Sequence, residues 1–169
     1  NHGELMHADS IHFPDSLKYQ TKKLARTVYG GGGIMPDFFV PIDTTQYTDY
    51  HRNIVAKGVV IKTTMKFIES HRKELQSKYK KFETFNDKFE ISDEILANMQ
   101  TLAEQEKIKF DEKQYRKSLP LIKTQLKALI ARDLWDMNEY FQIMNTTDSS
   151  VLQALKVLNE GAYEKVVRL

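Results

Sequence analysis

The sequence predicts a mainly α fold of the α+β type, in which a bundle of four to five helices follows a short β-rich segment. Residues 1–47 hold five of the seven glycines and three of the four prolines, and this composition is typical of short strands between turns. From residue 48 onward, apolar residues recur at offsets of three and four, which indicates amphipathic helices. We therefore expect two parts, 1–47 and 48–169.

The first part is expected to contain three short strands, at Leu17–Tyr19, Thr27–Tyr29 and Phe38–Val40. The run between the last two is Tyr29-Gly30-Gly31-Gly32-Gly33-Ile34-Met35-Pro36-Asp37. Glycine tolerates positive φ and close backbone approach, and proline favours extended backbone in the residue before it. The run therefore predicts a strand, a wide glycine loop, a turn and another strand. Three such strands are too few to bury a core by themselves.

The second part is expected to begin with a long amphipathic helix. Its inward stripe should contain Ile61, Met65, Ile68, Arg72 and Leu75. Phe85 and Phe89 follow at a spacing of four, so we expect them to share a helix face. Ser92 or Asp93 can cap the next helix. The side chains that should face the core from that helix are Ile95, Met99 and Leu102, with Leu96 and Ala103 beside them.

The remaining helices are expected after Asp111, which can serve as an N-cap. Pro120 should interrupt the pattern, so that 113–118 and 119–144 are separate or kinked. The polar run 145–148 should end this helix. A last helix is expected to bury Val151, Leu155, Leu158, Ala162, Val166 and Leu169.

Composition excludes several classes of partner and site. The net charge is +2, from 25 basic and 23 acidic residues, and this balance argues against nucleic acid as a partner. The chain has no cysteine, which excludes disulfides and thiolate chemistry. The sequence contains no run of 18 apolar residues, so no transmembrane helix is predicted. Because the chain begins at Asn1 rather than Met, we expect it to be part of a longer protein.

No catalytic or ligand-binding constellation is predicted. The glycine run lacks the Lys-Ser/Thr of a phosphate loop and does not open a helix, which disfavours nucleotide binding. His2, His7 and His12 lie in a polar lead-in without helical spacing, and this favours a flexible end over a metal site. No serine has the sequence context of a nucleophile. We therefore predict no catalytic residue, no metal site and no cofactor.

Four motifs together resemble a known family. They are Lys18-Tyr19-Gln20-Thr21, Arg26-Thr27-Val28-Tyr29, Gly32-Gly33-Ile34-Met35-Pro36-Asp37 and Phe39-Val40-Pro41. This series is similar to the late part of the core domain of the C-terminal processing (tail-specific) serine peptidases, the tricorn-core relatives of the crotonase fold. The helices that follow resemble the C-terminal region of the Bacteroidetes subgroup. The structural motif residues are Arg26, Gly30, Gly31, Gly32, Gly33, Pro36 and Asp37.

The resemblance implies that residues 1–47 complete a peptidase core sheet and that residues 48–169 form a helical accessory domain. The parent would be an exported periplasmic or cell-envelope endopeptidase that cleaves proteins near their C-termini by a Ser/Lys mechanism. Its nucleophile and base would lie upstream, so no catalytic residue is assigned here and the chain alone is expected to be inactive. Its partners would be the upstream core of the same polypeptide and the parent's protein substrates. The exposed strands predict that the isolated chain either has loosely ordered residues 1–20 or forms a homodimer through the strands.

One residue departs from the family pattern, and one alternative remains open. The family's Gly-Arg pair is Ala25-Arg26 here, which would strain the turn if positive φ were needed at residue 25. The alternative function is a stand-alone helical protein-interaction module, in which the glycine loop is a linker. The gene upstream of Asn1 would discriminate between them, since a peptidase parent requires several hundred preceding residues.

Overall fold

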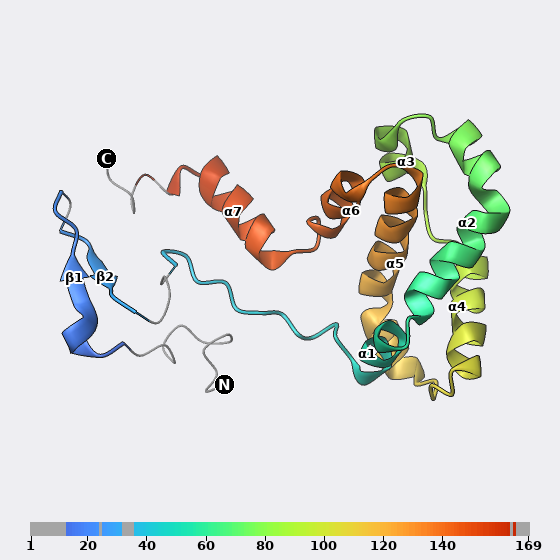
Figure 1. The fold of residues 1–169 in the computed structure, drawn as a ribbon, viewed down its shortest axis with the longest axis horizontal. Coiled ribbons are helices and arrows are strands. Elements are labelled where there is room, and N and C mark those ends of the chain that lie inside the picture. The colour runs from blue at the N-terminus through green and yellow to red at the C-terminus, as the bar shows by residue number, and fades with distance from the viewer. Residues whose placement is uncertain (1–12, 24, 32–35, 163, 165–169) are drawn as a thin grey trace. The chain divides into compact units, whose positions relative to one another are not determined.

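The computed structural model describes residues 13–23, 25–31, 36–162 and 164, and the predicted mainly α fold is confirmed (Figure 1). The described chain divides into two compact units. Asn1–Asp43 and Ser149–Leu169 contribute to one, and Thr44–Asp148 is the other. The first is called here the N-terminal unit and the second the helical unit. The predicted domains 1–47 and 48–169 concern a larger parent protein and stay a prediction.

The N-terminal unit contains a two-stranded antiparallel hairpin. A 3₁₀ turn, Asp15–Leu17, leads into β1, Lys18–Gln20, which pairs with β2, Thr27–Tyr29. In this register Tyr19 lies opposite Val28. The third expected strand, Phe38–Val40, was predicted wrongly, because these residues have no ladder partner in the described part of the chain and form a bend followed by irregular backbone.

The helical unit begins with α1, Asp49–Ala56, and α2, Val59–Lys78. Gly58 separates them with φ +69°, a left-handed conformation that glycine adopts without steric cost. The buried residues of α2 include Val60, Thr64 and Ile68. The predicted inward stripe was therefore wrong in part. Ile61 and Met65 are 48% and 64% exposed and Arg72 is also exposed, because α1, α4 and α5 pack on a face that is rotated by about one residue.

The next two helices are α3, Phe82–Lys88, and α4, Asp93–Gln105. The rings of Phe85 and Phe89 stack with centroids 4.6 Å apart, which confirms that they share a face. Ser92 is the N-cap of α4 and accepts a hydrogen bond from the amide of Ile95, as expected. Ile95, Met99 and Ala103 are buried in the core, as predicted.

The longest helix, α5, runs through Glu112–Leu134 with Asp111 as its N-cap, which accepts from the amide of Gln114. The predicted separation into two helices at Pro120 was wrong, since Pro120 lies inside one continuous helix, and the predicted kink stays a prediction. Proline removes the bond that its amide would donate to the carbonyl of Arg116. Both residues are exposed, so water can solvate that carbonyl, while the buried side of α5 is held by α1, α2 and α6.

The predicted helix 119–144 is divided in two by Trp135 and Asp136. Trp135 has φ −126° and ψ −100°, and its indole lies 5.3 Å from the ring of Phe85. Asp136 then caps α6, Met137–Met144, through the amide of Met137 at 2.6 Å. The break therefore follows from a tertiary aromatic contact together with a local cap.

The last described helix, α7, spans Ser149–Asn159. The expected inward set was wrong in part. Val157 is buried, whereas Leu155 and Leu158 are exposed. The predicted residues Val166 and Leu169 lie outside the described residues.

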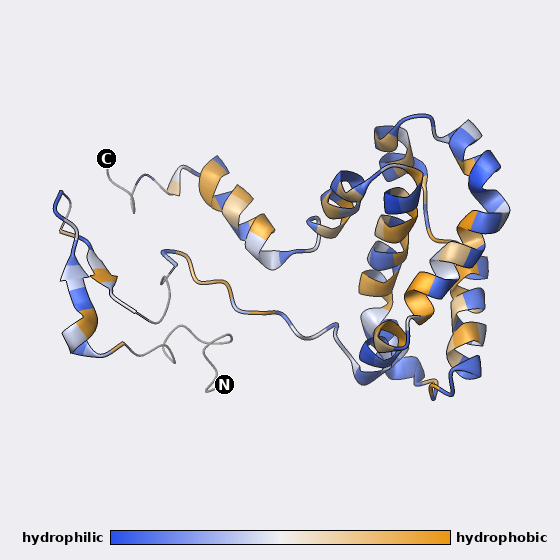
Figure 2. Cartoon of the chain, viewed as in Figure 1, coloured by the Kyte–Doolittle hydropathy of each residue, from blue (hydrophilic) through white to orange (hydrophobic). Residues whose placement is uncertain are grey.

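One hydrophobic core holds the helical unit together. Figure 2 shows hydrophobic and hydrophilic residues alternating along its helices, as amphipathic helices require. Helix α5 contacts α1, α2 and α6, and α2 also contacts α1 and α4. The largest fully buried side chains of this core are Phe85, Ile54, Ile68, Ile95, Met99, Ile122, Leu126 and Ile130.

A test of this core compares two phenylalanines. Phe85→Ala should lower the free energy of unfolding by about 3–5 kcal/mol, because Phe85 is fully buried among Tyr79, Phe89 and Trp135. Phe141→Ala is the control, with an expected loss below about 1 kcal/mol, because that side chain is 50% exposed. Urea denaturation of the chain measures both. Equal losses in the two variants would contradict the described core.

Candidate functional site

The predicted motif of the N-terminal unit contains an ion pair. The guanidinium of Arg26 contacts the carboxylate of Asp37, so the residue before β2 is joined to the residue after Pro36. The side chains are 37% and 44% exposed. A pair this exposed contributes about 0–1 kcal/mol to stability, so its main effect is to bring the two ends of the glycine segment together. Gly32 and Gly33 lie outside the described residues.

The hairpin turn places Ala25, which stands where the resembled family has glycine, at a positive φ. The Ala25 amide donates to the Thr21 carbonyl at 3.0 Å, and the Arg26 amide donates to the Thr21 hydroxyl at 3.0 Å. These bonds fix a turn in which Ala25 has φ +48°. A non-glycine residue in this region carries about 1–2 kcal/mol of strain. The turn therefore needs the positive φ that a glycine would supply without strain.

The two described glycines of the run serve different purposes. Gly31 has φ +94°, which only glycine adopts readily. Gly30 donates its amide to the Leu17 carbonyl at 2.8 Å and extends the hairpin by one bond. A Cβ on Gly30 would lie 2.7 Å from Cε2 of Tyr19, but that ring is exposed and can move. Gly31 is thus the more constrained of the two.

Pro36 and Asp37 also line a groove of about 540 Å³ in the N-terminal unit. Phe38 and Val40 form part of the same groove, together with residues of α7 that include Val157. The predicted strand Phe38–Val40 therefore contributes to an apolar wall, although it pairs with no strand.

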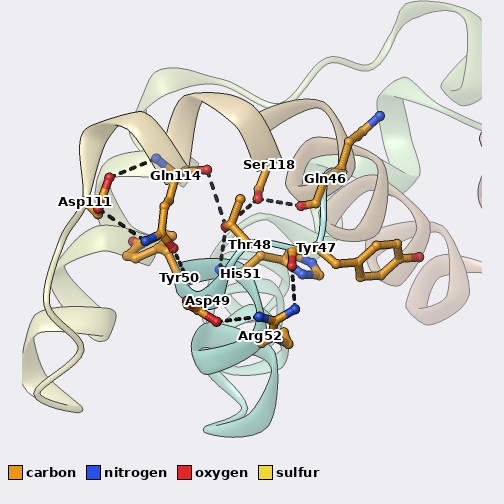
Figure 3. A network of polar contacts seen from close by, with 10 residues as sticks. All are labelled: Gln46, Tyr47, Thr48, Asp49, Tyr50, His51, Arg52, Asp111, Gln114 and Ser118. Carbon is orange, nitrogen blue, oxygen red and sulfur yellow. Dashed lines mark hydrogen bonds and ion pairs between the residues drawn. The ribbon is translucent and has the colours of Figure 1, made fainter. Parts of the chain in front are cut away.

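A second group of polar side chains joins the start of α1 to α5 (Figure 3). The Ser118 hydroxyl donates to the Gln46 carbonyl at 2.6 Å and accepts from the Thr48 hydroxyl at 2.8 Å. Thr48 in turn accepts from the amide of His51 and so caps α1. Gln114 accepts from the Tyr50 amide at 2.8 Å. Two amides of the first turn of α1 are thus satisfied by side chains, one of them from α5.

Ser118 and His51 do not form a nucleophile and a base. Ser118 is fully buried and its proton is directed to a backbone carbonyl. His51 is 2% exposed, and its Nε2 lies 2.9 Å from Gln125 Oε1. A nucleophile must be reachable by substrate and hydrogen-bonded to its base, and neither condition is met. The network is therefore an anchor for the segment that leads into the helical unit.

Sequence reasoning missed this anchor, although a signal for it exists. Gln114, Ser118 and Gln125 lie on α5 at helical offsets of four and seven, so they share one face. Polar residues on the otherwise apolar face of a helix indicate partners across the interface, because a buried polar group without one is costly. The same face contains the buried Ile122.

Two buried atoms of this network, the Tyr50 hydroxyl and Nδ1 of His51, have no hydrogen-bond partner among the described residues. The ring of Tyr50 makes edge contacts with Phe110 and Tyr115, at centroid distances of 5.7 and 6.0 Å. Burial raises the pKa of Tyr50 to about 12, with smaller contributions from Tyr115 and Glu104.

Within the described residues, no cluster of three His, Asp or Glu side chains could hold a metal ion. His2, His7 and His12 lie outside them. Among the described helices, none combines the length and the apolar character needed to cross a membrane.

Comparison with known protein families gives a match to the helical unit. Residues 50–136 match the model of a family of unknown function, DUF8443. The chain belongs to this family. The DUF8443 match runs from Tyr50 in α1 through α5 to the cap of α6, so it includes Ser118 and omits the glycine motif. No curated protein and no solved structure matches the chain.

The turn at residue 25 gives a prediction. Ala25→Gly should relieve about 1 kcal/mol of strain and slow hydrogen exchange of the Gly30 amide about fivefold, since that amide reports on the hairpin. The control is Ala97→Gly on the exposed face of α4, where glycine should instead speed exchange in the helix. Faster exchange of Gly30 in Ala25→Gly would contradict the positive φ.

Tyr50 gives a prediction with a pH dependence. At pH 7, Tyr50→Phe should raise the free energy of unfolding by about 1 kcal/mol, because it removes a buried hydroxyl without a partner. The raised pKa means that the native state holds the phenol proton more tightly than the unfolded state does. The wild-type chain should therefore lose stability relative to Tyr50→Phe as the pH rises from 10 to 12. Tyr47→Phe is the control, because that side chain is exposed. It should change neither the free energy of unfolding at pH 7 nor the loss of stability between pH 10 and 12.

Proposed function

We propose that the chain is the C-terminal part of an exported serine endopeptidase of the C-terminal processing family, which cleaves proteins near their C-termini. The N-terminal unit would complete the sheet of the peptidase core, and the DUF8443 helices would form an accessory domain. The nucleophilic serine and its lysine base would lie upstream. The parent would act in the periplasm or cell envelope.

The observation that supports this proposal is the contact between Arg26 and Asp37. These residues belong to separate motifs of the resemblance, eleven positions apart. Their contact joins two of the separate sequence motifs, as a shared structural role would require. The positive φ of Ala25, where the resembled family has glycine, supports the same reading.

A stand-alone helical interaction module remains the second candidate. The observation that favours it is the exposed apolar pair Ile61 and Met65 on α2. Apolar residues on one exposed helix face are typical of a surface that contacts another protein. Under this proposal the glycine segment would be a linker. A homodimer through the exposed strands also stays a prediction.

The first test is the gene upstream of the codon for Asn1, followed by expression of the whole encoded polypeptide. We expect the parent to cleave peptides near a free C-terminus and the chain of 169 residues to be inactive. Asp37→Asn in the parent should lower kcat/KM about tenfold or more, because it releases one end of the glycine loop.

The matched control is Asp49→Asn, which breaks the similar exposed pair of Asp49 with Arg52 on α1 and should leave activity unchanged. Equal effects of the two substitutions on kcat/KM would show that the Arg26–Asp37 contact has no particular role in activity. A start codon directly before Asn1 would leave the interaction module as the function.

A further inference from the structure

The helical unit contains a pocket that none of the preceding functions uses. It has a volume of about 420 Å³ and lies where α3, the segment after it, α5 and the end of α6 meet. Ligand pockets in proteins typically have volumes of about 300–1,000 Å³, so this one is large enough for a small molecule or one residue of a peptide.

One wall of the pocket is apolar. It contains Phe89, Ile91 and Ile143, which come from the segment after α3 and from α6. All three are buried in the core of the helical unit, so their positions are held by packing. This wall can receive an apolar group without moving the surrounding helices.

The lining residues that come from α5 are partly cationic. Lys123 and Lys127 lie one turn apart on α5 and both line the pocket. The ammonium of Lys127 donates to the backbone carbonyl of Asn86 at 2.6 Å, and this is its one acceptor among the described residues. The same ammonium lies 6.0 Å from the centroid of the Phe85 ring. At least one of its N–H groups is thus left for a ligand.

The charge of Lys127 is incompletely balanced. Burial lowers the pKa of Lys127, and this effect exceeds the opposite effects of Glu90 and Asp87. A partly desolvated cation gains more from an added anion than a fully hydrated one does. Glu90 also lines the pocket, so the lining carries two positive charges and one negative charge.

We propose that this pocket binds a single carboxylate that is joined to an apolar group. The carboxylate contacts the ammonium groups of Lys123 and Lys127, and the apolar group lies against Phe89, Ile91 and Ile143. The net charge of the lining, +1, suits a monoanion, whereas a phosphate dianion would face Glu90. The ligand is either the free C-terminus of a peptide or a free carboxylic acid. The assignment does not depend on the peptidase proposal.

Nuclear magnetic resonance titration of the whole chain tests this site. Hexanoate should shift the methyl signals of Ile91 and Ile143 in a saturable way, whereas hexanol and inorganic phosphate should bind at least tenfold more weakly. A hexapeptide that ends in leucine should bind with a free carboxylate and not with an amide if the ligand is a chain end. If hexanoate binds and the hexapeptide does not, the ligand is a free carboxylic acid. Binding of either hexanoate or the hexapeptide with a free carboxylate supports the site.

Substitutions locate the charge contact. Lys127→Met retains the apolar stem of the side chain and should weaken carboxylate binding at least tenfold. Lys117→Met, on the exposed side of α5, is the control and should have no effect. The comparison of hexanoate with hexanol needs no variant, so it holds even if Lys127→Met fails to fold. Equal binding of hexanol and hexanoate, or no binding of any carboxylate, would overturn the proposal.

Discussion

The burial of α5 is the constraint on which the helical unit depends. Its residues Ile122, Leu126, Ala128, Ile130 and Ala131 are completely buried, so this helix must be covered on several sides. Helices α1, α2 and α6 provide the cover. The small side chains of Ala128 and Ala131 allow close approach of the neighbouring helices. Pro120 removes one backbone hydrogen bond from α5, and the burial of apolar side chains along the rest of this continuous helix offsets that loss.

The same burial explains the polar anchor. Ser118 lies on the buried side of α5, and a hydroxyl there needs partners to offset the loss of water. Gln46 and Thr48 supply them, and the consequence is that the segment before α1 has a defined place on α5. A polar residue that would otherwise destabilise the core therefore fixes the point at which the chain enters the helical unit. This point is where any upstream domain would be attached.

Two helix caps were predicted correctly from the sequence, whereas some features that depend on tertiary packing were not. Ser92 and Asp111 were identified as caps because a cap depends only on a side chain and the amides that follow it. The inward face of α2 was misplaced at Ile61 and Met65, because the choice of face depends on which helices pack against it. The break at Trp135 was missed for the same reason, although Asp136 followed by Glu139 is a local signal for a helix start. In the N-terminal unit, the sequence predicted the two strands that form the hairpin, but their pairing and the contact of Arg26 with Asp37 required coordinates.

The two units differ in how much stabilising contact each has within itself. The helical unit has a buried core with capped helices, and a match to one family spans most of it. The hairpin has three residue pairs, and its strands are exposed apart from the half-buried Tyr29. A hairpin of this size is marginal in water, and an exposed ion pair adds little to it. Yet its turn contains Ala25 at φ +48°, a strained conformation for a non-glycine residue that persists only where surrounding structure stabilises it. This imbalance is a physical argument for the proposal in which the hairpin belongs to a larger sheet.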